Sequence, residues 1–365
     1  MRLKATILMI AFLLVSSTGF VMAKRNDFPG AVYTMTNSAG GNEVLVFSRS
    51  ADGSLIPAGA FATNGLGTGG GLGNQGGLIL TPDNQWLFVV NAGSNTISVF
   101  NVKPDDLVFI GAFDSGGSRP ISLTVDGDLL YVLNAGGAVG AEDNITGFII
   151  EPDGVLQALE GSTQPLSGTN TSPAQIEFST DGNVLVVTEK ATSIIDTYGI
   201  DDDGLAGPPN FFGSAGIVPF GFSFGKRNRL YVSEAGTNSA SSYQVYPDGS
   251  LEVISAAVPT GQTGVCWLVI TKNGRYAYTT NAGTGNISGF NIDRDGTISL
   301  LDQDGVTAEA ALGVIDEAFS HNSRYLYALS SAATTIFGFQ VGSDGGLTLV
   351  DEINLQTGAN GLAAH

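Results

Sequence analysis

The stretch Tyr131-Val132-Leu133-Asn134-Ala135-Gly136 decides the fold, because related stretches recur along the whole chain. The other copies contain Tyr33, Phe88, Val186, Tyr231, Tyr278 and Tyr327, which makes seven in all. Tyr33 and Tyr327 lie 294 residues apart, so the six intervals between them average 49 residues. Seven such units account for 343 of the 365 residues and leave no room for a second folded domain.

Each unit has the pattern of four short antiparallel strands. A strand that ends in a turn precedes the Tyr segment, as in residues 176–182, and an alternating strand follows it, as in residues 97–102. A second turn then leads to a last short strand, as in residues 247–253. Asp-Gly turns between alternating apolar segments indicate hairpins. We therefore predict an all-β, seven-bladed β-propeller with four antiparallel strands per blade.

The two ends of the chain are expected to have different roles: the first is a targeting segment and the last is part of the fold. Arg2 and Lys4 precede an apolar segment at residues 7–15, and Ala23 is a plausible cleavage point. We expect residues 1–23 to be a signal peptide and residues 24–365 to be the single propeller domain, secreted or periplasmic and without a stable membrane span. An uncleaved membrane anchor is the alternative. Residues 361–365 fit a first strand, so the C-terminal strand should close the ring and protect its edges.

The composition limits the partners. The formal charge is -19 and only 13% of residues are charged, so nucleic acid, which needs clustered Lys and Arg, is not an expected partner. One cysteine excludes an internal disulfide framework. Two histidines, at positions 321 and 365, give little support to a Ser-His-Asp site. We expect a monomer with a small-molecule ligand or substrate.

The strands of a blade can be lettered A to D from the channel outward, which places the loops on two faces. The A–B and C–D turns share one face, and the C–D turns carry an aspartate in all seven units. The B–C loops and D–A connections share the other face, where we expect the ligand site at the channel mouth. Strand B ends there in Asn91, Asn134, Glu189, Glu234 and Asn281, and strand A begins there near Gln75, Arg119, Gln175, Phe220, Trp267 and Asp316.

Two interpretations of the polar residues remain open. Each Asn or Glu at the end of strand B can simply cap the adjacent turn through its side chain. Alternatively, the amides and carboxylates form a polar ring that binds a small molecule or a divalent cation such as calcium, with Glu189, Glu234, Asn134 and Asn281 as the oxygen ligands. Cys266 is either a thiol that faces the channel beside Trp267 or a buried small apolar residue.

The repeats resemble the YVTN and lactonase-like seven-bladed propellers, a superfamily that includes 6-phosphogluconolactonase and carboxymuconate cyclase. The stretches that carry the resemblance are residues 185–190, residues 218–222, and Cys266-Trp267 followed by residues 278–283. The resemblance implies a lactonase-type hydrolase, and the exported branch is the most similar. The cytosolic branch usually has Pro-His at the start of one strand A, where this chain has Arg119-Pro120-Ile121. Only Arg119, Glu189 and Glu234 are comparable to that branch's His, Arg and Glu.

Two functions follow as hypotheses. In the first, Arg119 or a cation polarises the carbonyl of a small lactone, and Glu189 or Glu234 activates water as general base. Asn91, Asn134, Asn281, Gln75, Gln175, Trp267 and Asp316 would then bind the ligand. In the second, the protein is a propeller that binds a ligand or another surface without catalysis, because a fold can keep its architecture and lose its chemistry.

Overall fold

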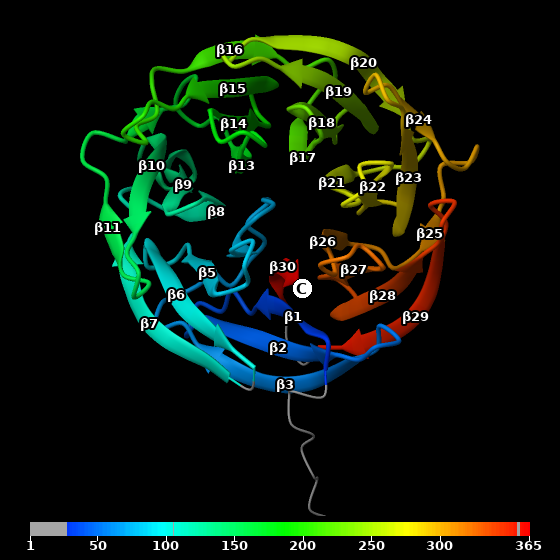
Figure 1. Cartoon of the computed structure of the whole chain (residues 1–365), viewed down its shortest axis with the longest axis horizontal. Helices are drawn as coiled ribbons and strands as arrows, with labels where there is room; N and C mark the ends of the chain where they lie inside the picture. Colours follow the sequence, from blue (N-terminus) through cyan, green and yellow to red (C-terminus); the bar gives the residue numbers. More distant parts are fainter. Residues whose placement is uncertain (1–27, 105, 356–357) are drawn as a thin grey trace, which may run out of the picture.

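Seven small antiparallel sheets form a closed ring around a central channel in the computed structural model (Figure 1). The structure describes residues 28–365 except 105 and 356–357, so the expected signal peptide lies outside the described residues. Each sheet is one blade, and its strands follow one another outward from the channel. The seven-bladed propeller with four strand positions per blade is confirmed.

The two inner positions of each blade hold single, continuous strands. Strand A is β30 (Asn360–Ala364), β4 (Leu78–Leu80), β8 (Pro120–Asp126), β13 (Pro173–Phe178), β17 (Pro219–Gly225), β21 (Val265–Ile270) and β26 (Val314–Phe319). Strand B is β1 (Gly30–Met35), β5 (Trp86–Asn91), β9 (Leu129–Ala135), β14 (Val184–Glu189), β18 (Arg229–Glu234), β22 (Tyr276–Asn281) and β27 (Tyr325–Ser330).

The outer positions are less regular. Strand C is β2 (Glu43–Arg49), β6 (Thr96–Lys103), β10 (Asp143–Ile150), β15 (Ile194–Gly199), β19 (Ser239–Val245), β23 (Asn286–Ile292) and β28 (Thr335–Val341). Strand D is β3 (Leu55–Ala62), β7 (Asp106–Asp114), β16 (Asn210–Gly213), β20 (Leu251–Pro259) and β29 (Leu347–Asn354), with split strands β11 (Leu156–Ala158) and β12 (Gln164–Pro165), and β24 (Ile298–Leu300) and β25 (Ala308–Glu309). A short 3-10 helix, η2 (Gly136–Val139), follows β9.

The first blade is completed by the end of the chain, as the sequence predicts. Strand β30 pairs antiparallel with β1, with Val32 opposite Ala364 and Tyr33 opposite Ala363. The Tyr33 hydroxyl also lies 3.2 Å from Nε2 of His365. Closure gives β1 a partner on both sides, β2 and β30, so β1 offers no free edge for unwanted strand pairing.

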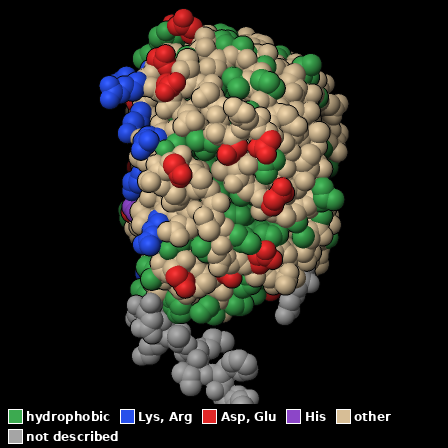
Figure 2. Space-filling model, turned by 90° about the vertical axis from the view of Figure 1, so that its right-hand side faces the viewer, with side chains coloured by type: hydrophobic (Ala, Val, Ile, Leu, Met, Phe, Trp, Pro, Cys, Tyr) green, Lys and Arg blue, Asp and Glu red, His purple; other side chains and the backbone are tan. Residues whose placement is uncertain are grey.

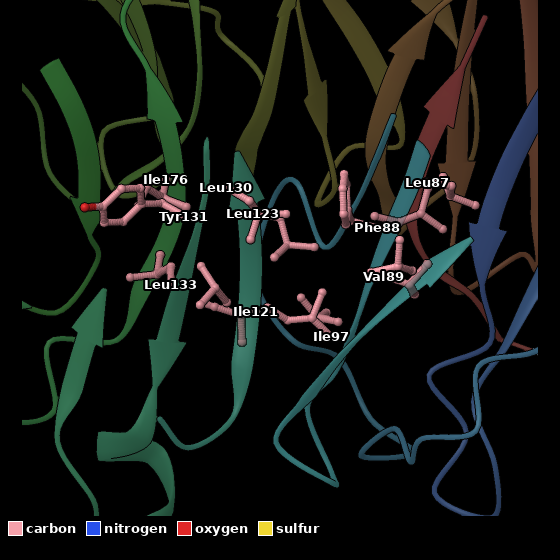
Figure 3. Close-up of a cluster of buried hydrophobic side chains, with 14 of the residues drawn as sticks. Leu87, Phe88, Val89, Ile97, Ile121, Leu123, Leu130, Tyr131, Leu133 and Ile176 are labelled. Carbon is pink, nitrogen blue, oxygen red and sulfur yellow. The ribbon is translucent and has the colours of Figure 1, made fainter. Parts of the chain in front are cut away.

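The core lies between the blades. Figure 3 shows apolar side chains from neighbouring sheets that meet in one cluster, among them Val89 of β5, Leu123 of β8 and Ile176 of β13. Strand B is buried on both faces, which explains why its sequence is continuously apolar before the terminal polar residue.

A strand-B tyrosine joins the third, the sixth and the seventh blade to the blade that follows. The Tyr131 hydroxyl donates to the Gly204 carbonyl at 2.9 Å, in the C–D turn of the following blade. Tyr278 and Tyr327 make the same contact with Gly345 and Gly53, both at 2.7 Å. These glycines have φ between 80° and 92°, a region that favours glycine, so the Asp-Gly turn and the tyrosine act together.

The loops define two faces, as expected. We call the face with the A–B and C–D turns the A–B face, and the face with the B–C and D–A loops the D–A face. Within residues 28–365, apart from the gaps, no helix is long and apolar enough to cross a membrane.

We expect Tyr131→Phe to lower the free energy of unfolding by about 2 kcal/mol. The Tyr131 hydroxyl donates to Gly204 and accepts from the backbone amide of Ala206 at 2.9 Å, so its removal leaves two buried backbone groups unpaired. Urea unfolding measures the difference. Tyr246→Phe is the control, since the Tyr246 ring is 40% exposed; an equal loss in both variants would contradict the interpretation.

Candidate functional site at the D–A mouth

A glycine-rich connection occupies the D–A end of the channel. The segment between β3 and β4 reaches toward the centre of the ring (Figure 1). The backbone amide of Gln75 donates to the Ala174 carbonyl at 3.1 Å, and Nε1 of Trp267 donates to the Asn74 carbonyl at 2.8 Å. The segment must approach other backbone closely, because a Cβ on Gly67 would lie 2.1 Å from the carbonyl carbon of Asn37.

Five residues from four blades gather beside this segment, and we call them the mouth cluster: Arg119, Lys190, Phe220, Cys266 and Trp267. The Phe220 and Trp267 rings are 4.7 Å apart, and Nζ of Lys190 lies 4.9 Å from the Phe220 ring centre. Lys190 Nζ also donates to the carbonyls of Gly73 and, at 2.9 Å, Pro173. The cluster therefore combines an aromatic wall with two cationic side chains.

Electrostatics distinguish Lys190 from the other groups of the mouth cluster. Burial, with a smaller contribution from the charge of nearby Arg119, lowers the pKa of Lys190 to about 8. A lysine with this pKa is present partly as the neutral amine near neutral pH. Burial raises the pKa of the Cys266 thiol to about 12, despite the positive charge of Lys190, so this thiol is protonated and not a nucleophile.

A cavity of about 970 Å³ opens on the same face between the first and last blades. Trp267, Ile315 and Gly73 form its inner end, so only the glycine-rich segment separates it from Lys190. Asn360 also lines it, and the amide oxygen of this 5% exposed residue has no hydrogen-bond partner among the described residues. The cavity is large enough for a small organic molecule.

The polar residues of strand A do not all reach this mouth. Oε1 and Nε2 of Gln75 bond to the backbone of Leu268 across the channel, and those of Gln175 bond to Phe222 of the next blade. Gln75, Gln175 and Asp316 line a separate cavity of about 460 Å³, which also contacts Thr180 in an A–B turn. These three side chains therefore line the channel wall, whereas Trp267 and Arg119 lie in the mouth cluster.

Asp316 also links two neighbouring strands of the channel wall. It accepts a hydrogen bond from the backbone amide of Leu362 at 3.1 Å and lies at a β-bulge with φ of 31°. Burial raises the pKa of Asp316 to about 8 and that of Glu177, in the same cavity wall, to about 8. These carboxyls are largely neutral near pH 7, which is compatible with their burial in a channel wall.

The two glutamates at the end of strand B are also enclosed in the protein. Glu234 is 0% exposed and accepts hydrogen bonds from Gly216 N at 2.7 Å and from the hydroxyls of Ser214, Ser239, Ser241 and Tyr243. This arrangement joins the D–A connection to strand C and corrects the expectation that the carboxylate faces the mouth.

Glu189 is arranged in the same way and has an unusual neighbour. It is 0% exposed and accepts hydrogen bonds from Ser167 and Thr192. Burial, a hydrogen bond with Glu189 and the charge of Glu189 together raise the pKa of Asp196 to about 9, so Asp196 is protonated at neutral pH. Both carboxyls are buried within the blade, and neither is placed to activate water at the mouth.

The asparagines at this position stabilise their own blades. Nδ2 of Asn91 donates to Ser98, that of Asn281 donates to Ser288, and that of Asn134 donates to the Ser115 carbonyl. The capping interpretation thus describes all five residues better than the polar ring. Among the described residues, no three His, Cys, Asp or Glu side chains lie together as a possible metal site.

Sequence reasoning missed Lys190 as a functional residue. It stands directly after Glu189, in one of the stretches that carry the family resemblance, and is one of only 15 basic residues in the chain. The scarcity of basic residues in the chain was the available signal. The contact of Lys190 with Gly73 and its proximity to Arg119, however, depend on three separate blades. Repeat spacing alone does not predict that contact.

The fold is a seven-bladed propeller with a cluster of aromatic and basic side chains at one end of its channel. The profile of the family described as "Lactonase, 7-bladed beta-propeller" matches residues 41–139 and 223–317, which is more than half of the chain. The chain belongs to this seven-bladed β-propeller lactonase family. No curated protein sequence matches it significantly.

Solved structures show the same fold at low identity. A candidate 6-phosphogluconolactonase from Bacteroides fragilis is 18% identical, with a TM-score of 0.72 over 94% of this chain and 99% of that one. The periplasmic gluconolactonase of Pseudomonas aeruginosa, PpgL, is also 18% identical, with a TM-score of 0.71 over 92% and 98%. At this identity the likeness establishes the architecture and leaves the reaction to the site.

Glu234→Ala should lower the free energy of unfolding by about 3 kcal/mol or more, because it leaves several buried donors unpaired. Glu234→Gln should cost less, since one acceptor oxygen remains. Thermal and urea unfolding of both variants measure these differences. Glu43→Ala is the matched control because Glu43 is exposed; a Glu234→Ala protein as stable as this control would show that the hydrogen bonds contribute little.

Proposed function

We propose that the protein is a lactonase-type hydrolase that acts on a small lactone with an anionic substituent. The observation that carries the proposal is the position of Lys190 and Arg119 together beside the Phe220–Trp267 wall at the D–A mouth. Family membership supports hydrolysis of a lactone as the class of reaction. The guanidinium of Arg119, in an otherwise acidic protein, favours a carboxylate or phosphate on the substrate.

In the proposed mechanism Lys190 replaces the glutamates as general base. The neutral amine donates its two N–H groups to the carbonyls of Gly73 and Pro173, which leaves the nitrogen lone pair for a water proton. The water oxygen attacks the lactone carbonyl carbon as its proton passes to Nζ. Arg119 stabilises the oxyanion. The ring C–O bond then breaks, the ring oxygen takes the proton from Nζ, and a hydroxy acid leaves.

We expect Lys190→Met and Lys190→Arg both to reduce kcat/KM for a lactone by a factor of about 100 or more, the range of general-base catalysis. Arginine keeps the charge but not a titratable base, so the matched pair separates the two roles. In the unchanged protein kcat/KM should rise as the pH increases through about 8, because deprotonation of Lys190 produces the base. Full activity in Lys190→Arg would contradict this role.

Binding without catalysis is the second candidate function. The 970 Å³ cavity and the unpartnered amide oxygen of Asn360 favour it, because they offer a ligand site without a base. A lactone or its hydroxy acid that binds in calorimetry but shows no turnover would favour this candidate over hydrolysis.

We propose further that the protein is exported, either secreted or periplasmic. The support is the basic start at Arg2 and Lys4, the apolar segment at residues 7–15 and the small residue Ala23. Intact mass of the protein recovered outside the cytoplasm should correspond to residues 24–365. A full-length chain retained in the membrane would instead indicate an uncleaved anchor.

A further inference from the structure

The A–B face is divided into two halves of opposite charge. The A–B turns of the fifth, sixth and seventh blades carry Lys226, Arg227, Lys272, Arg275 and Arg324, which we call the basic arc; all five are exposed. The A–B turns of the second, third and fourth blades carry exposed Asp83, Asp126, Asp128 and Asp181, which we call the acidic arc. Figure 2 shows Lys and Arg side chains gathered along one edge of the molecule.

The A–B face is not uniformly acidic, because most of the described Lys and Arg residues lie on it together with the C–D turn aspartates. The repeats predicted the acidic turns correctly, but they did not reveal how the A–B turns of successive blades differ in charge.

Hydrogen bonds between blades hold the basic arc in place. Nζ of Lys226 donates to the Asn273 carbonyl at 2.7 Å, and the Lys272 amide donates to Oγ of Ser323 at 2.9 Å. Nζ of Lys272 lies 3.0 Å from Nε2 of His321. Lys272 and Arg275 also line a groove of about 640 Å³ between the sixth and seventh blades. Contacts with the following A–B turn therefore position the charges of Lys226 and Lys272.

The opposing half is equally well defined. The Thr81 hydroxyl and the Gln85 amide hold the pKa of Asp83 below its ordinary value, so this carboxylate stays ionised. Asp181 accepts a hydrogen bond from Nδ2 of Asn228 at 2.6 Å, which fixes it at the border between the fourth and fifth blades. The hydrogen bonds that hold Lys226 and Lys272 lead to neighbouring turns of the basic arc rather than to the acidic arc.

We propose that the A–B face is a self-association surface, on which the basic arc of one copy meets the acidic arc of a second copy. A two-fold axis in the plane of the face, along the border between its halves, brings both pairs of arcs together at once. Charge complementarity of this kind sets orientation and association rate. The interaction also opposes the repulsion expected from the net charge of -19.

A second copy fits this face better than a linear polyanion. The C–D turn residues Asp248, Asp295 and Asp344 oppose a polyanion and the acidic arc of a second copy alike, but a polyanion on the basic arc would gain nothing from the acidic arc. A second copy satisfies both halves. The dimer would cover the channel cavity lined by Glu177 and Asp316 and leave the D–A mouth open on its two outer surfaces. The proposal is therefore independent of the proposed hydrolysis.

Sedimentation velocity tests the proposal on the full mature protein. We expect a concentration-dependent dimer at 0.1 M salt that dissociates at 1 M salt, where the Debye length falls to about 3 Å. The double variant Lys272→Glu/Arg275→Glu should weaken association at least tenfold. Glu142→Lys, which changes the charge of an exposed residue in a B–C loop on the opposite, D–A face, is the control and should leave the dimer intact.

A charge exchange makes the test specific. Asp126→Lys/Asp181→Lys should also be monomeric, but an equimolar mixture with Lys272→Glu/Arg275→Glu should form a heterodimer, because each arc then faces its opposite charge. Circular dichroism confirms that both variants are folded. An unchanged protein that is monomeric at every salt concentration, or that binds inorganic polyphosphate through the basic arc while remaining monomeric, overturns the proposal, as does a mixture that fails to associate.

Discussion

The hydrogen bond from a strand-B tyrosine to a turn carbonyl of the next blade is the contact on which the ring depends. Tyr131, Tyr278 and Tyr327 each reach a glycine carbonyl in the following C–D turn, and the last of these contacts joins the seventh blade to the first. A single blade could neither bury this ring nor satisfy its hydroxyl. At these three junctions the interaction makes the stability of one blade depend on the next.

The end of strand B shows how a repeated position can change residue type without changing its role. Asparagine donates to strand C or to the D–A connection in three blades, whereas Glu189 and Glu234 accept from serines, threonine and backbone amides. The exchange works because the surrounding groups change from acceptors to donors. Glutamate is unusual in a turn, and for that reason the sequence suggested a catalytic role for Glu189 and Glu234. The hydrogen-bond partners that account for these two glutamates come from the D–A connection, the B–C turn and strand C.

The mouth was predictable in part. Arg119 and Trp267 could be assigned to the mouth because the place of a residue within the 49-residue repeat tells on which face of the ring it lies. Gln75 could not be placed, because it crosses the channel to Leu268, 193 residues away, and no periodicity encodes that contact. Lys190 was missed for a related reason: burial and Arg119 give it a lowered pKa only when separate blades have been brought together.

By itself the sequence determined the number of blades, the four strand positions, the closing role of the C-terminal strand and the division of loops between two faces. These features follow from a 49-residue period and from alternation of apolar and turn residues, which are local properties of the chain. Only the tertiary structure decided which polar side chains face a cavity and which are enclosed. That outcome depends on hydrogen-bond partners from other blades, and on the desolvation that accompanies their packing.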